Sequence, residues 1–451
     1  MSGGADPVPD QENHHGESQW SIALRQFRKR ATAVWGLRVV RFLFYLAVFA
    51  PAIACGLPLA WREPGGDLEF PWLAKVFDRL YWANGVDRLF NLLMFAVLIW
   101  WIVRLILKLM DSELSEAERG QRRKKAFLVL IGVVVFAAIL QGFKTPGLYS
   151  SQPYVDYHEK VEQFDVEEER VRNALANVGT PEAKAKLEKR LSELENRTAV
   201  FTFVPFGHRE QSPRGVADRF KGLGHESPRG KHLLGTSETG QDVLAQLIYG
   251  TRISLTVGIL AVSIYVTIGL IMGGIAGYVG GTTDLLIMRL IEIILSVPGL
   301  FLILTIIALF DERSIFMIMF AIGIVGWTGI ARLVRGEFIR ERGKDYVAAA
   351  KSLGLSSPRI LFRHVMPNAV APVIVSATFG VAAAIITEST LSFLGLGDPT
   401  VPSWGQMLDT GRTNAEWHMI AVPGIAIFLT VTMLNLVGDG LRDALDPKLR
   451  K

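Results

Sequence analysis

Residues 255-278 read LTVGILAVSIYVTIGLIMGGIAGY, a stretch without a single charged side chain. A helix of about 20 apolar residues covers the roughly 30 Å of hydrocarbon in a bilayer, so this stretch predicts a membrane span. Apolar residues gather in eight blocks of this kind, near 39-60, 88-107, 126-142, 255-278, 285-310, 314-334, 370-396 and 418-438. We therefore predict an all-α polytopic membrane protein with about eight transmembrane helices.

The composition of the chain agrees with a membrane protein and excludes several other classes. Apolar residues make up 50% of the 451 residues and charged residues 20%, which is less than the roughly 25% usual in soluble domains. The net charge of +5 is too small and too scattered to indicate a nucleic-acid partner. The single cysteine, Cys55, excludes an internal disulfide and a cysteine-clustered metal site.

The distribution of basic residues predicts the orientation in the membrane. Lysine and arginine concentrate at 25-41, 119-125, 335-363 and 448-451. All four clusters fall on the cytoplasmic side if both termini are cytoplasmic, as the positive-inside rule requires. The first 35 residues lack the features of a cleaved signal, so we expect the first block to remain as a membrane anchor.

The segment between the third and fourth blocks has a different composition. Charged residues with interspersed apolar ones predict a helix that ends at Gly179, and Thr180, Pro181 and Glu182 are typical of the start of a second helix. We expect a charged helical hairpin outside the membrane, which either contacts a partner or is a solvated helix pair without one. The predicted domains are a cytoplasmic tail (1-35), a three-span N-terminal region (36-142), a periplasmic segment (143-250), a five-span core (251-440) with a cytoplasmic loop at 337-368, and a cytoplasmic tail (441-451).

The cytoplasmic stretch 345-368, DYVAAAKSLGLSSPRILFRHVMPN, predicts a helix-turn-helix. Three consecutive alanines favour a helix that another protein can approach closely. Gly354 can adopt the left-handed conformation that ends this helix, and Ser357 with Pro358 can begin a second one that ends before Pro367.

Several residues inside the spans indicate packing or a solute pathway. Gly269, Gly273 and Gly277 form a stripe of small residues that allows close approach of another helix, either within this chain or in a partner. Arg289 and Glu292 stand three residues apart, so we expect each to neutralise the other. Glu388 has no such neighbour and is a candidate for lining the pathway or locking the spans together. Pro298 predicts a kink in the fifth span.

Five stretches occur in a fixed order in the second half of the chain: 232-255, 345-368, TESTLSFLGLG at 387-397, PSWGQML at 402-408, and 435-451. Together they resemble the inner-membrane permease subunit of a bacterial ATP-binding-cassette (ABC) importer of the dipeptide, oligopeptide or nickel type. The resemblance implies a five-span, MetI-like permease core that couples to ATPase subunits through the stretch 345-368. The coupling residues that it implies are Tyr346, Ala348, Ala349, Ala350, Gly354, Ser357, Pro358, Phe362, Pro367 and Asn368. One departure is Ala348, where the family has a glutamate.

The resemblance also implies partners. These are a homologous permease that completes the translocation pathway, two ABC ATPase subunits, an extracytoplasmic solute-binding protein and the lipid bilayer of the inner membrane. The implied cargo is peptides or related small solutes. The two spans near 88-107 and 126-142 exceed the usual plan of the family, and the sequence offers no function for them.

The chain contains no phosphate-binding loop of the Gly-x-x-x-x-Gly-Lys-Ser/Thr type, so we expect ATP to be bound by partner subunits and this chain not to be an enzyme. No paired histidines with metal-ligand spacing occur, and we expect neither a metal nor another cofactor. Two alternative functions stay open: a self-standing secondary transporter, and a membrane sensor or scaffold that uses the outer hairpin.

Overall fold

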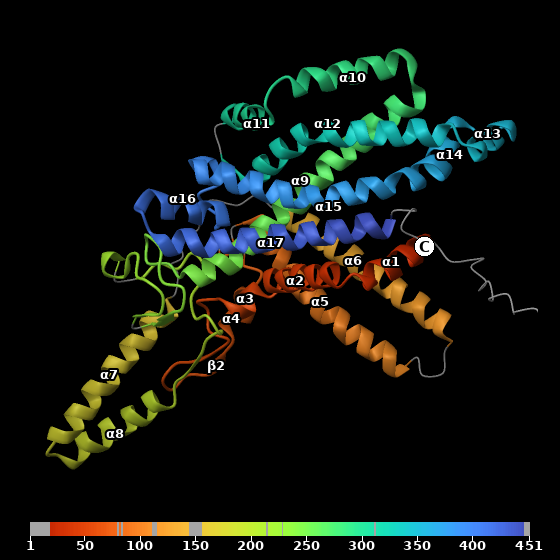
Figure 1. The fold of residues 1–451 in the computed structure, drawn as a ribbon. Coiled ribbons are helices and arrows are strands. Elements are labelled where there is room, and N and C mark those ends of the chain that lie inside the picture. Colours follow the sequence, from red (N-terminus) through yellow and green to blue (C-terminus); the bar gives the residue numbers. More distant parts are fainter. Residues whose placement is uncertain are drawn as a thin grey trace, which may run out of the picture.

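The computed structural model describes residues 19-78, 81-82, 84-110, 115-143, 156-212, 215-227, 229-310 and 313-445. Most of the predicted N-terminal tail and the end of the predicted C-terminal tail lie outside these ranges. Figure 1 shows long helices that run roughly alongside one another, with a pair of helices projecting from one end of the bundle.

Six helical segments among the described residues are long and apolar enough to cross a membrane. They are α2 (Ala31–Val48), α5 (Gly85–Met110), α9 (Val243–Val279), α12 (Ile315–Arg342), the stretch Ala369–Leu396 in α15 (Met366–Leu391) and η3 (Ser392–Leu396), and α17 (Trp417–Leu445). The third predicted block lies on another long helix, α6 (Glu116–Phe143), which is not one of these six. These elements make the protein an all-α polytopic membrane protein.

The fifth predicted span is broken. Helices α10 (Gly281–Leu295) and α11 (Gly299–Ala308) would cross the membrane together, but they meet at an angle of 83°. Pro298 lies in the break, where its ring and missing N–H prevent continuation of the helix. The predicted kink is thus confirmed, and the pair counts as a seventh span if it is taken as one.

The prediction for the first span, 39-60, begins and ends too far along the chain. The helix α2 starts at Ala31 and ends at Val48, and only the short helix α3 (Ala50–Ile53) follows it. The apolar residues after α3 pack in the part of the molecule that carries the projecting helices α7 (Tyr157–Asn177) and α8 (Pro181–Glu195), which we call the outer part. Cys55 and Leu57 are buried there in one cluster with Val204 and Phe206. The apolar run therefore extends beyond the end of the span, because its later residues are buried in a protein core outside the span.

The centre of the bundle is the close packing of α9 against α12. A Cβ atom added to Gly269 would lie 2.9 Å from the carbonyl oxygen of Trp327, and one added to Gly277 would lie 2.7 Å from that of Arg335. Gly273 likewise faces the backbone of Ala331. The predicted glycine stripe therefore packs within this chain, and helix α12 occupies it.

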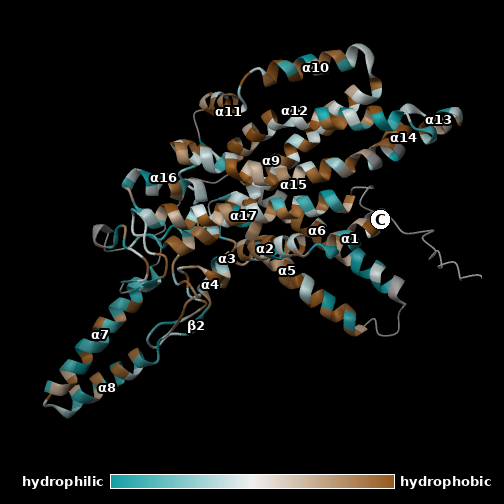
Figure 2. Ribbon diagram, in the orientation of Figure 1, coloured by the Kyte–Doolittle hydropathy of each residue, from teal (hydrophilic) through white to brown (hydrophobic). Residues whose placement is uncertain are grey.

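The two ends of the bundle differ in charge. Helix α1 (Gln19–Lys29), the start of α6 and the helices α13 (Asp345–Ser352) and α14 (Ser357–Ile360) lie at one end, on the right in Figure 1. These are the segments that carry the predicted basic clusters. Hydrophobic residues predominate along the helices between the two ends, as Figure 2 shows.

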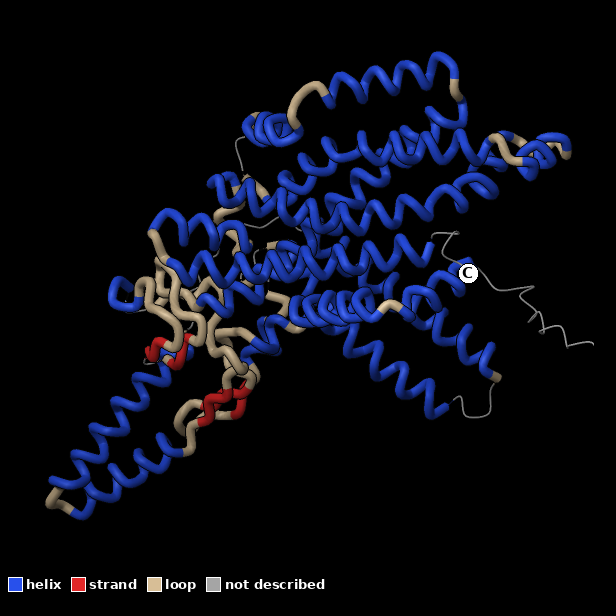
Figure 3. Tube along the Cα trace, in the orientation of Figure 1, coloured by secondary structure: helices blue, strands red, loops and turns tan. Residues whose placement is uncertain are grey.

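The opposite end carries the charged hairpin and two small sheets (Figure 3). The hairpin consists of α7 (Tyr157–Asn177) and α8 (Pro181–Glu195), which confirms the predicted helix pair. The first helix ends at Val178 in an extended conformation and not at a left-handed Gly179. The sheets have the order β2-β1-β3, from Leu68–Glu69, Ala60–Arg62 and Thr198–Val200, and β4-β5, from His225–Ser227 and Gly230–His232.

The base of the hairpin is fixed to the rest of the outer part. The Trp61 ring of β1 stacks on Phe164 of α7 at 6.2 Å, and Nζ of Lys160 lies 2.5 Å from a carboxylate oxygen of Glu63. The carboxylate of Asp156 caps the first turn of α7 by accepting from two backbone N–H groups. The short helices α4 (Pro71–Lys75), η1 (Gly215–Asp218) and α16 (Trp404–Asn414) complete this end of the molecule.

Candidate functional site

The stretch 345-368, which we call the elbow, lies at the basic end of the bundle beyond the end of α12. Gly354 follows α13 and has φ of +73°, so the predicted left-handed conformation is confirmed. Its backbone N–H donates to the carbonyl of Lys351 at 2.9 Å, and that of Leu355 donates to Ala350 at 3.2 Å. Only glycine adopts this conformation without a steric cost, so Gly354 sets the sharp reversal between α13 and α14.

The elbow presents a small apolar surface to its surroundings. Ala350 is buried against the bundle, whereas Ala348 and Ala349 are exposed. Leu353, next to the turn, is 80% exposed. A leucine this exposed at the tip of a rigid turn is suited to contact with another protein, and the sequence analysis did not single it out.

A buried carboxylate holds the start of the elbow in place. Glu341, near the end of α12, is 1% exposed and accepts from Nζ of Lys344 at 2.6 Å and from Oη of Tyr346 at 2.7 Å. Tyr346 was predicted from the resemblance, whereas Glu341 was missed. The signal that could have identified it is an acidic residue within the basic run of residues 340-344.

The sequence predicted that the second helix of the elbow ends before Pro367, but it continues past this residue. Helix α14 continues through a π-helical turn, η2 (Leu361–Val365), directly into α15. The N–H of Met366 donates to the carbonyl of Leu361, one residue farther back than in an α-helix. Pro367 directly follows this wider turn, which accommodates its ring and its missing N–H within a continuous helix. The side chains of Pro358, Phe362 and Asn368 lie outside the described part of the structure.

Glu388 lies near the other end of α15 and is completely buried. The hydroxyl of Ser392 donates to Oε1 of Glu388 at 2.8 Å, and that of Ser389 lies 3.5 Å from its Oε2. Hydroxyl groups of this chain therefore enclose the carboxylate. Both hydroxyls belong to the same helical stretch as Glu388, so its pathway and packing roles stay predictions.

Arg289 and Glu292 form the expected pair, with 2.7 Å between Nη1 and Oε2. Both side chains are more than half exposed on α10. Each charge therefore neutralises the other, as expected.

A second polar cluster, which the sequence analysis did not find, joins the additional span α5 to α9. The guanidinium of Arg252 is fully buried, and its Nη1 lies 3.1 Å from Oδ1 of Asp87. Its Nη2 donates to Oδ1 of Asn91 at 3.1 Å and its Nε to the carbonyl of Ala47 at 2.7 Å. The imidazole of His208 lies 3.8 Å from Asp87, but burial lowers its pKa to about 4, so it is neutral at pH 7. Arg252 is therefore the cation that balances Asp87.

The bundle, with its broken span and the helical elbow at its basic end, is the architecture of a polytopic membrane protein. Residues 266-451 match the family described as "Binding-protein-dependent transport system inner membrane component", and residues 18-62 match the "N-terminal TM domain of oligopeptide transport permease C". The chain belongs to this family of ABC transporter permeases, whose members are non-enzymatic membrane subunits.

Three relatives illustrate the similarity. The oligopeptide transport system permease protein OppC of Haemophilus influenzae is 44% identical over 49% of this chain and 72% of its own length. The di/tripeptide transport system permease protein DppC of Pseudomonas aeruginosa is 42% identical over 50% of this chain and 75% of its own length. The glutathione transport system permease protein GsiD of Pectobacterium atrosepticum is 39% identical over 50% of this chain and 76% of its own length.

Proposed function

We propose that this chain and a homologous permease together form a pathway for peptides or related small solutes across the inner membrane. Two ABC ATPase subunits bind the cytoplasmic elbow, and an extracytoplasmic solute-binding protein delivers the cargo at the end that carries the hairpin. The peptide class of the cargo is supported by the names of the relatives, which include oligopeptide, di/tripeptide and glutathione permeases.

The observation that carries the proposal is the geometry of the elbow. It combines a left-handed glycine, exposed small residues and an exposed leucine, all held on the bundle by the buried Glu341. Such a rigid protrusion fits into a cleft of a partner without ordering cost. Its continuity with α15 provides a mechanical link, because a shift of the elbow moves a membrane-spanning helix. Opposite shifts in the ATP-bound and ATP-free states produce alternating access.

The first experiment isolates the tagged chain from its native membrane and measures the ATPase activity that co-purifies. Gly354→Val forces a β-branched residue into a left-handed conformation and distorts the turn. We expect it to lower the co-purifying ATPase activity at least tenfold. Gly343→Val is the matched control, because Gly343 lies next to the elbow at an ordinary φ of −80°. Equal ATPase activity in both variants would refute docking through the elbow.

A second experiment tests the sidedness. The side chains of Val166 on α7 and Leu353 on the elbow are both exposed in this chain, so exposure does not distinguish them. In intact cells, a membrane-impermeant maleimide should label Val166→Cys, which lies outside in the proposed orientation, but not Leu353→Cys, which lies in the cytoplasm. The only native cysteine, Cys55, is buried and provides a low background. Labelling of Leu353→Cys from outside would overturn the proposed orientation and the ATPase contact together.

A further inference from the structure

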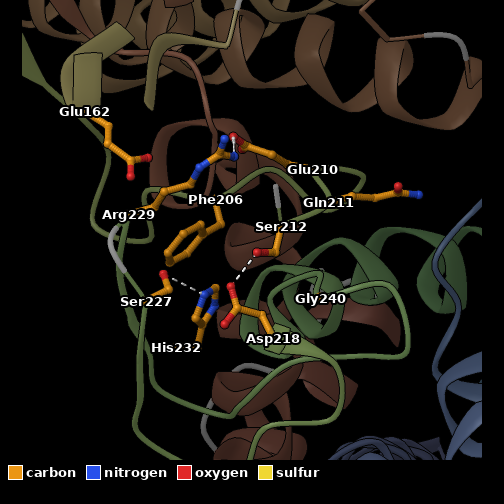
Figure 4. A pocket seen from close by; sticks show the side chains of 10 residues that line it. All are labelled: Glu162, Phe206, Glu210, Gln211, Ser212, Asp218, Ser227, Arg229, His232 and Gly240. Carbon is orange, nitrogen blue, oxygen red and sulfur yellow. Dashed lines mark hydrogen bonds and ion pairs between the residues drawn. The ribbon is translucent and has the colours of Figure 1, made fainter. Parts of the chain in front are cut away.

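A partly open cavity of about 160 Å³ lies in the outer part of the molecule, beside the base of the hairpin. Figure 4 shows the side chains that surround it, which come from α7, from the loop before η1 and from the β4–β5 hairpin. Glu162, Glu210 and Arg229 approach one side of it, and the ring of Phe206 forms an apolar wall.

Arg229 brings unused hydrogen-bond donors to this cavity. Its side chain is only 5% exposed, and Nη2 lies 2.6 Å from Oδ2 of Asp156. The Nε and Nη1 groups are buried and find no hydrogen-bond partner among the residues that the structure describes.

Glu210 brings an unused acceptor. Its side chain is 6% exposed, and Oε2 accepts from the backbone N–H of Gly207 at 2.9 Å. Oε1 is buried and accepts no hydrogen bond within the described ranges; its contact with Nη1 of Arg229 is an ion pair at 3.6 Å, too long for a hydrogen bond. Burial raises the pKa of Glu210 to about 7. A buried acceptor left without a hydrogen bond is costly, so a site that contains one is suited to a donor from outside the chain.

The charges around the cavity indicate the kind of donor. Asp218 is already engaged with the hydroxyl of Ser212 and the imidazole of His225. Arg229 is shared between the carboxylates of Asp156 and Glu210. With Glu162 also at the cavity, three carboxylates face this one cation, and negative charge is in excess. The missing group is therefore a cation that can donate to Glu210, and an acceptor beside it would meet the free donors of Arg229.

We propose that this cavity binds a primary ammonium group with a carbonyl oxygen next to it, as in an amino-acid amide or at the N-terminal residue of a peptide. The ammonium donates to Oε1 of Glu210, and the carbonyl oxygen accepts from the guanidinium of Arg229. The ring of Phe206 provides an apolar surface for the side chain of the ligand. This site goes beyond the proposed transport function, and its test involves neither ATPase nor transport.

The experiment uses the full chain in detergent micelles and measures binding of alaninamide by calorimetry at pH 7.5. N-acetylalaninamide, which keeps the carbonyl oxygen but lacks the ammonium, is the matched probe. We expect it to bind at least tenfold more weakly than alaninamide, because charge-assisted hydrogen bonds are the strong ones. Glu210→Gln should weaken alaninamide binding at least tenfold, whereas the exposed Glu226→Gln on β4 should not change it.

A measurement at pH 5.5 adds an independent readout. The ammonium of the probe stays charged, whereas Glu210 becomes protonated, so binding should weaken by about 20-fold. Other titratable and charged groups lie around Glu210 on every side. They are Cys55, Tyr81, Asp156, Glu162, His208, Arg209, Asp218, Arg229 and His232. Glu210→Gln should remove most of the pH dependence, which separates Glu210 from these neighbours.

Three results would overturn the proposal. They are equal binding of the two probes, unchanged alaninamide binding in Glu210→Gln, and no binding of either probe.

Discussion

Replacing Asp87 by alanine removes the carboxylate that balances the fully buried guanidinium of Arg252. The remaining partners of Arg252 are neutral oxygens, on Asn91 and on backbone carbonyls such as that of Ala47. His208 cannot replace the lost negative charge, because an imidazole is either neutral or positively charged. Loss of one partner of a buried ion pair costs about 3–5 kcal/mol. We expect a destabilisation of this size for Asp87→Ala.

The assay is unfolding of the detergent-solubilised chain, followed by circular dichroism. Asp87→Asn keeps an oxygen acceptor but loses the charge, so its destabilisation should be smaller than that of Asp87→Ala. The double variant Asp87→Leu/Arg252→Met replaces the pair by apolar side chains and should recover most of the lost stability. Glu238→Ala is the control, because it breaks an exposed pair with Arg219, which is worth at most about 1 kcal/mol.

The reasoning is wrong if Asp87→Ala destabilises the protein by no more than Glu238→Ala does. It is also wrong if the double variant is less stable than Asp87→Ala alone. Either result would mean that water or another group reaches Arg252 in the bundle. If the expected results are found, the additional span α5 is an integral part of the bundle, joined to α9 by a buried ion pair.

Three further outcomes follow from the packing, the elbow and the outer cavity. Gly273→Val should lower the melting temperature, at a cost of about 1–3 kcal/mol, because its added atoms meet α12, whereas Gly329→Val faces open space and should leave it unchanged. Leu353→Glu should lower co-purifying ATPase activity several-fold without a change in melting temperature, since the side chain is 80% exposed. Glu210→Gln should stabilise the protein at pH 8 by up to about 3 kcal/mol and give little gain at pH 4.5, because burial raises the pKa of Glu210 from 4.5 to about 7. A raised pKa means that wild-type stability falls as pH rises between these values, and a gain that is equal at both pH values would contradict this cause.

Features with a local physical cause could be predicted from the sequence. The turn at Gly354, the break at Pro298 and the helix pair on either side of Thr180 each depend on the conformational preferences of a few consecutive residues. The glycine stripe of α9 was also recognisable, because its four-residue spacing places the glycines on one face. The sequence left open whether that face meets the same chain or a partner, and helix α12 provides the answer.

Features that depend on distant contacts could not be predicted. Asp87 and Arg252 are 165 residues apart, and nothing near either of them indicates that they meet. The first span was misplaced because hydropathy does not distinguish lipid from a protein core, and residues such as Leu57 are buried in the latter. The end predicted before Pro367 was wrong because a wide π-helical turn allows the backbone to pass this proline without a loop.

That uninterrupted passage has a mechanical consequence. With no loop between η2 and α15, a displacement of the elbow reaches α15 through helical backbone, and Pro372 inside α15 is the point at which this helix bends most easily. The 26 residues of α15 extend about 39 Å at 1.5 Å per residue. A tilt of this rod by a few degrees about its midpoint moves both ends by about an ångström in opposite directions. A displacement applied beside Gly354 would then move Ser389 and Ser392, the serines that contact Glu388 near the other end of this helix.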